Sequence, residues 1–411
     1  MKLKKEKLLN KIKSSSFILY KNHPIKNYKD EDKFKKKCLN YEKKFKEIIV
    51  KNLKKKNKTG HFYDYLLGPW LNLFVESVFL KYLIINKEKE IIFNEFNLFF
   101  PGIKTSEKFG RLIQENENFN NHLIRDIANN LKIEIKYKKK FYFEDEILDE
   151  DKNLRFKLRN FFKNIVISFF NLFPSLSKKK KIILDGVFNF KDELIFIIRN
   201  KFLYKRSHFP KFKKDKIFFD LNFKHEEKNE FMILLVKLSK KYFPNKIKNI
   251  LSHISEIDEF KKERKNKIFI TDRLSSINED YRIFVAQNNK NLDIFSVQHG
   301  GGYGQIKNFY LQKYEINNCK KFLSWGWKKN NFKIEPIALR KKNTSVNKLK
   351  TIKNILFVGS NFCLYEFRLN TVPIASKVLY RSDYIKNKLS LINFLSKNRK
   401  LTYKPHPANN W

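Results

Sequence analysis

A histidine followed by a dense run of glycines is the first feature of this sequence that could do chemistry. The stretch SVQHGGGYG places Gln298 and His299 directly before Gly300, Gly301 and Gly302. The whole chain has only 11 glycines, and four of them fall within five positions here. Glycine allows backbone N–H groups to approach an anion closely, and histidine can bind a phosphate or act as an acid or base near neutral pH. The alternative is a tight glycine turn beside a structural histidine.

The spacing of these glycines excludes two familiar phosphate-binding loops. A dinucleotide-binding G-x-G-x-x-G motif needs glycine where Gln305 stands, and no G-K-[ST] sequence follows, as a Walker loop requires. The chain also lacks an H-E-x-x-H sequence, a paired-cysteine motif and the signature of a Ser-His-Asp hydrolase. We therefore expect neither a metal nor an organic cofactor.

Three other segments contribute candidate binding residues. In YKPHP, Lys404 and His406 follow a strand and prolines stiffen the exit, which suits a phosphate or carboxylate ligand; a turn histidine is the alternative. In FLSWGW, Trp325 could stack on a nucleobase or sugar, although tryptophan more often belongs to a core. Glu315 lies on an expected helix between the glycine cluster and FLSWGW and is a candidate contact for a hydroxyl or a base.

The elements that must position these residues alternate between strands and helices. Apolar segments typical of buried strands occur at 181–190, 216–223, 267–273, 292–298, 320–327, 354–360 and 400–407. Helical segments, such as 276–289 and 384–397, separate them. This alternation favours an α/β fold with a parallel sheet covered on both faces. A strand that ends at Gln298 and His299 places them at the carboxyl edge of that sheet, where ligands bind in open α/β folds.

The stretch from His61 to Ile85 predicts one long, nearly buried helix. Pro69 suits its first turn, and Asn72, Glu76 and Lys81 form a single narrow polar stripe. No apolar run is long enough and free enough of charge to predict a membrane-spanning helix.

The chain of 411 residues is strongly basic, with a formal net charge of +46. Lysine is spread along the sequence together with Asn, Ile and Phe, all encoded by A/T-rich codons, so codon bias accounts for the excess without any partner. A basic surface would still favour anionic lipid headgroups or phosphorylated substrates. Residues 1–58 are charge-dense, and we expect a solvated or partly ordered helical region with little core-forming capacity there. Three distant cysteines and the lack of a signal peptide favour the cytoplasm.

The chain resembles a family of transferases encoded in bacterial surface-carbohydrate (lipopolysaccharide and capsule) gene clusters. The matching segments are LLGPWLNLF (66–74), FVAQNNKNLDIFSVQHGGGYGQ (284–305) and FLSWGW (322–327), in the same order and spacing. More distantly, an HG turn followed by a K-P-H-P segment is similar to the polyglycerolphosphate and capsule transferases of the GT-B type. That resemblance implies two Rossmann-like domains with a donor nucleotide in the cleft, and it carries contacts with the donor diphosphate over to His299, Lys404 and His406.

The charge-dense start of the chain, a polar stretch near 340–352 and the resemblance together predict an organisation of the chain. Residues 1–60 would form a charged helical region, 61–345 an N-terminal Rossmann-like domain with helical insertions, and 346–411 the start of a C-terminal Rossmann-like domain. A GT-B domain continues beyond its K-P-H-P strand, so we expect an incomplete C-terminal domain in a truncated chain.

These observations favour a transferase that moves a sugar or glycerophosphate-like unit from a nucleotide-activated donor to a surface polysaccharide or lipid-linked acceptor. In this hypothesis the amides of Gly300 to Gly302, with Lys404 and His406, stabilise the leaving diphosphate. His299 is either a second phosphate contact or the general base for the acceptor hydroxyl. The alternatives are a basic nucleic-acid-binding protein, which we do not expect because the aromatic residues lie within apolar runs, and an inactive scaffold of a polysaccharide assembly. We expect a cytoplasmic protein, in contact with the membrane only at its inner face.

Overall fold

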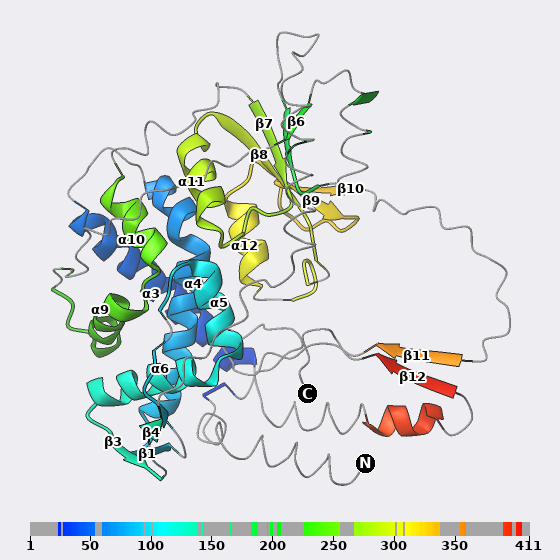
Figure 1. Ribbon diagram of the computed structural model, residues 1–411. Coiled ribbons are helices and arrows are strands. Elements are labelled where there is room, and N and C mark those ends of the chain that lie inside the picture. The colour runs from blue at the N-terminus through cyan, green and yellow to red at the C-terminus, as the bar shows by residue number, and fades with distance from the viewer. Residues whose placement is uncertain are drawn as a thin grey trace.

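A computed structural model describes most of the chain in separate stretches (Figure 1). The described residues are 24–25, 28–53, 60–93, 96–100, 102–138, 141–142, 165, 182–187, 195, 198–199, 204–206, 223, 226–254, 267–300, 302–306, 309–337, 354–358, 389–396 and 400–404. All structural statements below concern these residues.

Helices and strands are labelled as in Figure 1. The helices are α3 (Tyr28–Asn52), α4 (Gly60–Ile85), α5 (Ser106–Glu115), α6 (Glu117–Asn130), α9 (Glu230–Tyr242), α10 (Asn245–Ser252), α11 (Glu279–Asn288) and α12 (Tyr310–Asn317). The strands are β1 (Glu90–Phe93), β2 (Phe96–Asn97), β3 (Glu134–Tyr137), β4 (Phe141–Tyr142), β5 (Ile182–Asp185), β6 (Tyr204–Arg206), β7 (Lys267–Thr271), β8 (Leu292–Val297), β9 (Lys321–Trp325), β10 (Ile334–Ile337), β11 (Asn354–Val358) and β12 (Lys400–Lys404).

The centre of the fold is a six-stranded sheet in the order β10-β9-β8-β7-β5-β6. Every pair of neighbours in it is parallel, which confirms the expected parallel α/β sheet. After β5 the chain first pairs on one side, with β6, and then on the other, with β7. The carboxyl ends of β5 and β7 therefore form the topological switch point of the sheet, where open α/β folds commonly bind their ligands.

Helices α11 and α12 connect this sheet to the helical part of the molecule. α11 begins after Asn278, whose side chain accepts a hydrogen bond from Tyr281 N and so caps the first turn. It packs along α4, and α12 packs against β9 (Figure 1). The core beside the sheet includes Phe269, Phe284 and Phe322, all at most 3% exposed. Burial of these side chains holds the strands in register, and the register fixes where each strand ends.

Helix α4 is buried and covers the expected stretch, but the predicted place of Pro69 in it is wrong. Pro69 lies in its interior and not in its first turn, so the helix lacks one backbone hydrogen bond there. The polar stripe is buried as well: Glu76 Oε1 accepts hydrogen bonds from Lys35 Nζ (2.5 Å) and Asn72 Nδ2 (3.0 Å). Packing on all sides of α4 overrides the helix-breaking tendency of the proline.

Helix α4 also corrects the expectation about membrane-spanning segments. By length and composition alone it could cross a membrane, and 89% of its apolar window is buried inside the protein. The core helix of a globular domain passes the same test, so this is weak evidence for a membrane span.

The expectation of weak core formation in residues 1–58 is wrong for α3. Phe34, Cys38, Phe45 and Ile49 on this helix are at most 4% exposed and pack in the same core as α4. The apolar face of α3 is difficult to recognise in the sequence, because lysines are interspersed with the buried residues and outnumber them.

The remaining strands form three small parallel pairs, β1-β3, β2-β4 and β11-β12. A helix at 389–396 precedes β12, in agreement with the helix and strands expected in this part of the sequence. In Figure 1 the β11-β12 pair lies apart from the six-stranded sheet. The described chain is therefore a mixed α/β protein with several parallel sheets, compatible with a Rossmann-like fold.

Candidate functional site

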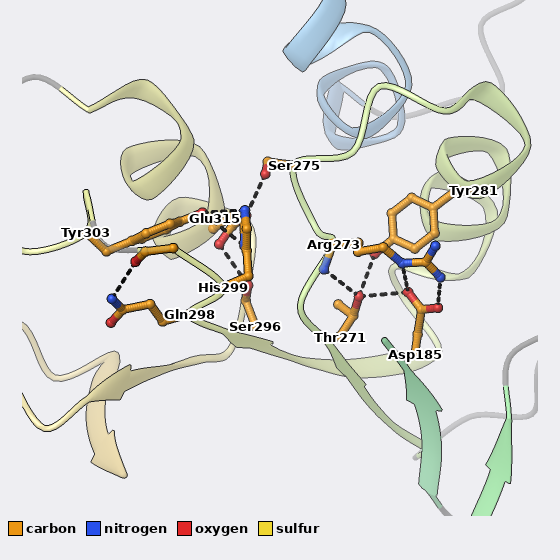
Figure 2. A network of polar contacts seen from close by, with 11 residues as sticks. Asp185, Thr271, Arg273, Ser275, Tyr281, Ser296, Gln298, His299, Tyr303 and Glu315 are labelled. Carbon is orange, nitrogen blue, oxygen red and sulfur yellow. Dashed lines mark hydrogen bonds and ion pairs between the residues drawn. The ribbon is translucent and has the colours of Figure 1, made fainter. Parts of the chain in front are cut away.

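The polar residues of interest gather at the carboxyl edge of the six-stranded sheet (Figure 2). They form two groups that lie next to each other. One group surrounds His299 behind β8, and the other surrounds Arg273 behind β5 and β7. The parallel register brings these strand ends together, since Asp185 is paired with Thr271 and Thr271 with Ser296.

Gln298 fixes the start of the glycine turn to the end of β9. Its Nε2 donates to Gly300 O (2.7 Å), and its Oε1 accepts from Trp325 N (2.9 Å) and Trp327 Nε1 (2.7 Å). The side chain is 4% exposed, so its amide serves the turn itself. Of the residues predicted to bind a donor, Gln298, Gly300 and Trp325 are thus brought together.

The glycines of the turn differ in how much space they require. Gly304 has φ +77°, and a Cβ there would lie 2.9 Å from Trp327 Cδ2, so this position needs glycine both for its backbone and for its packing. A Cβ at Gly302 would lie 3.1 Å from Ile306 Cδ1, whereas one at Gly300 would meet nothing closer than 3.8 Å. Gly301 lies outside the described residues. Packing thus explains Gly304 and leaves the space around Gly300 open.

His299 stands at the rim of this turn. Its side chain is 35% exposed, and Nδ1 lies 3.8 Å from Glu315 Oε1. The Tyr303 hydroxyl lies 3.2 Å from Nδ1 and 3.4 Å from Nε2. Burial lowers the pKa of His299 from its ordinary value of 6.5, so the imidazole is neutral at neutral pH. A neutral, partly exposed imidazole can accept a proton.

Glu315, on α12, lies behind His299. Its side chain is 0% exposed, Oε1 accepts a hydrogen bond from Ser275 Oγ (2.6 Å), and Oε2 accepts one from Ser296 Oγ (3.1 Å). Burial raises the pKa of Glu315 to about 7, although the hydrogen bonds from these hydroxyl groups lower it. The structure therefore brings Glu315 to the predicted site, in contact with the site's own side chains.

The sequence did not predict the second polar group, which lies at the switch point. The guanidinium of Arg273 binds both carboxylate oxygens of Asp185, which is 2% exposed, and Thr271 Oγ1 donates to Asp185 Oδ2 (2.9 Å). The side chain of Arg273 is 52% exposed, so one face of this ion pair is open. The sequence shows Asp185 and Thr271 only as two strand ends, and their pairing depends on the sheet order.

Asp272 completes the switch point. Its carboxylate lies over Gly186, where φ is +75° and any Cβ would collide with Oδ1. Burial and the nearby carboxylate of Asp185 raise the pKa of Asp272 to about 6. This carboxylate also influences the Tyr303 hydroxyl electrostatically, which links the two polar groups of the edge. Among the described residues, no three His, Cys, Asp or Glu side chains converge to hold a metal ion.

The other predicted donor contacts lie elsewhere. Lys404 is exposed at the end of β12, which belongs to the separate β11-β12 pair and not to the sheet that carries His299. His406 lies outside the described residues.

Comparison with known proteins identifies the family. A family model described as "LIC12162 family transferase" matches residues 4–411, nearly the whole chain. The chain belongs to the LIC12162 transferase family. Its general activity is therefore group transfer, which agrees with the prediction of a transferase. No curated protein and no solved structure matches the chain of this LIC12162 transferase.

Proposed function

We propose that this LIC12162 transferase moves a sugar or glycerophosphate-like unit from a nucleotide-activated donor to a surface polysaccharide or lipid-linked acceptor. The observation that carries the proposal is the position of His299. A neutral, 35% exposed imidazole stands at the carboxyl edge of a parallel sheet, directly before a glycine turn. The edge is where an α/β transferase would bind its substrates, and the imidazole is in the state required of a general base.

In the proposed reaction, His299 accepts the proton of the acceptor hydroxyl. The oxygen then uses the electron pair of its former O–H bond to form a bond to the transferred unit. If the unit is a sugar, its bond to the nucleoside diphosphate breaks and the diphosphate leaves with the electron pair. If it is a glycerophosphate-like unit, the P–O bond to the nucleoside monophosphate breaks and the monophosphate leaves with the electron pair. Backbone N–H groups of the glycine turn would stabilise the charge that develops on the phosphate of the leaving nucleotide. The proton on His299 is afterwards released to water.

A second Rossmann-like domain of the GT-B type is part of the proposal. The parallel pairing of β11 and β12, with helix 389–396 before β12, supports it, because parallel strands joined through a helix are the repeating unit of such domains. Lys404, at the carboxyl end of β12, and His406 beyond it would bind the donor diphosphate from that side. Such donors are made in the cytoplasm, and a lipid-linked acceptor would hold the enzyme at the inner face of the membrane.

Thermal unfolding of the full chain in the presence of nucleotides tests donor binding. We expect at least one of UDP, CDP, ADP and GDP to raise the unfolding temperature, because saturation at 100 times Kd adds about 2.7 kcal/mol. Failure of all four, and of their common sugar conjugates, would contradict a donor site in this protein.

Release of the leaving nucleotide from the donor that binds best, a diphosphate for a sugar donor or a monophosphate for a glycerophosphate donor, then tests the role of His299. We expect His299→Ala to lower turnover by about 10²- to 10⁴-fold, the usual contribution of a general base. His61→Ala is the matched control, because the His61 side chain is 83% exposed at the start of α4. Full turnover in His299→Ala would exclude His299 as the base.

A further inference from the structure

Glu315 is a fully buried carboxyl group whose surroundings consist of proton donors. Ser275 and Ser296 each donate to one of its oxygens, at 2.6 Å and 3.1 Å. The hydroxyl of Tyr303 and Nδ1 of His299 lie on its remaining side, the latter 3.8 Å from Oε1. Glu315 is thus the inner member of a pair whose outer member, His299, reaches the open edge of the sheet (Figure 2).

This arrangement gives the two ring nitrogens of His299 different tasks. A carboxylate behind Nδ1 favours the proton on Nδ1, and that leaves Nε2 as the unprotonated nitrogen that can accept a proton. It also stabilises the imidazolium that forms when a proton arrives. The 3.8 Å separation is longer than a hydrogen bond, as catalytic contacts often are in the absence of substrate.

We infer that Glu315 is a positioning residue, whose ionisation state selects the tautomer of His299 and thereby decides whether His299 can act as a base. The inference deepens the proposed function and rests on it for the role of the base. With Glu315 ionised, Nδ1 carries the proton. With Glu315 protonated, the carboxyl group donates to Nδ1, and the ring proton moves to Nε2.

Six neutral groups bond to Glu315 or interact with it electrostatically, and its burial among them explains why its protonation falls near neutral pH. Ser275 follows β7, Ser296 lies on β8, Tyr303 lies in the glycine turn, and Tyr281, Tyr314 and Cys319 come from α11, α12 and the residues after α12. None of these six groups is a cation. Burial therefore raises the pKa of Glu315 to about 7, whereas it lowers that of His299. These opposite shifts favour protonation of Glu315 before His299 on acidification, so we expect the loss of base activity to follow the protonation of Glu315.

The test is nitrogen NMR of the full chain labelled with ¹⁵N-histidine, which reports the tautomer of each ring without any substrate. The His299 signals are assigned as those missing from His299→Ala. We expect the wild-type signals to change from the Nδ1–H to the Nε2–H pattern as the pH falls through about 7. In Glu315→Gln we expect this change to disappear. Glu279→Gln is the matched control, because Glu279 is also buried, but it accepts from Ser106 N at the start of α5.

Ser275→Ala supplies a second variant that keeps the carboxyl group. The hydrogen bond from Ser275 is the strongest of those that lower the pKa of Glu315, so we expect its loss to move the tautomer change to higher pH. A tautomer change that is the same in the wild type and Glu315→Gln, or that does not move in Ser275→Ala, would overturn the inference. These outcomes are independent of donor binding, so the inference and the proposed function can fail separately.

Discussion

Replacement of Gly68 by alanine should reverse the usual effect of that substitution in a helix. Gly68 lies inside α4, where a change from glycine to alanine ordinarily stabilises a helix by about 1 kcal/mol. A Cβ at this position, however, would lie 2.7 Å from Tyr314 Cε2 on α12. The Tyr314 ring is held in place, because its hydroxyl accepts from Arg282 Nη2 (3.0 Å) and donates to Asp64 O (3.3 Å).

The two effects can be compared in magnitude. Overpacking of a well-packed contact costs about 1–3 kcal/mol, so a cost of about 2 kcal/mol set against the gain in helix propensity predicts a net loss of about 1 kcal/mol for Gly68→Ala. In a Tyr314→Ala background the clash is absent, and the same substitution should stabilise by about 0.5–1 kcal/mol. The sign of the effect should therefore depend on Tyr314.

A double-mutant cycle measured by urea unfolding tests this reasoning. The four proteins are the wild type, the two single variants and the double variant, and the comparison is valid where the dependence of the unfolding free energy on urea is unchanged. A coupling energy of about 1 kcal/mol or more between positions 68 and 314 is expected. Stabilisation by Gly68→Ala in the wild-type background would refute the account of how α4 and α12 pack.

Two further substitutions test the contacts around the site. Arg282 is 2% exposed and donates hydrogen bonds to Leu66 O, Ser276 O and Tyr314 Oη. Arg282→Met should therefore lower the free energy of unfolding, measured in urea, by about 3 kcal/mol, and Arg282→Lys should recover less than half of that loss. A loss of unfolding free energy below about 1 kcal/mol in Arg282→Met would contradict this prediction. Because the pKa of Asp272 is raised to about 6, the folded protein binds this proton more tightly than the unfolded chain, and stability falls as the pH rises from about 4 to above 6. Asp272→Asn removes this pH-dependent loss of stability, because the amide does not titrate. The urea midpoint of the variant, relative to that of the wild type, should therefore increase between about pH 4.5 and pH 7.5. A difference in midpoint that stays constant over this range would show that Asp272 does not titrate in this way.

The sheet edge was predictable because its strands are short apolar runs. The segments that contain β5, β7, β8 and β9 stand out from their lysine-rich surroundings, and a strand that stops at Gln298 has to present the next residues at a carboxyl edge. The sequence likewise predicts the helix that carries Glu315. Local pattern was sufficient for these features, since each depends on one stretch of chain.

The switch-point group was not predictable in the same way. Arg273 binds Asp185 across 88 positions of sequence, and their contact exists only because β7 pairs with β5 on the side opposite β6. Strand order is a property of the whole sheet, and no single segment specifies it. The position of Pro69 in α4 was missed for a related reason, because contacts with α3 and α11 hold this proline in the interior of a helix, whereas local rules favour it in the first turn.

The charge of the site edge differs from that of the chain as a whole. The chain carries a formal charge of +46, yet the switch point combines two carboxyl groups, Asp185 and Asp272, with one cation, Arg273. Under the proposed function, a diphosphate would be better accommodated beside the glycine turn at β8 and β9, and a hydroxyl-bearing group would be better accommodated near Asp272. The widely spread lysines would, under the same proposal, act at longer range and raise the local concentration of an anionic donor, whereas the polar groups of the edge would orient that donor.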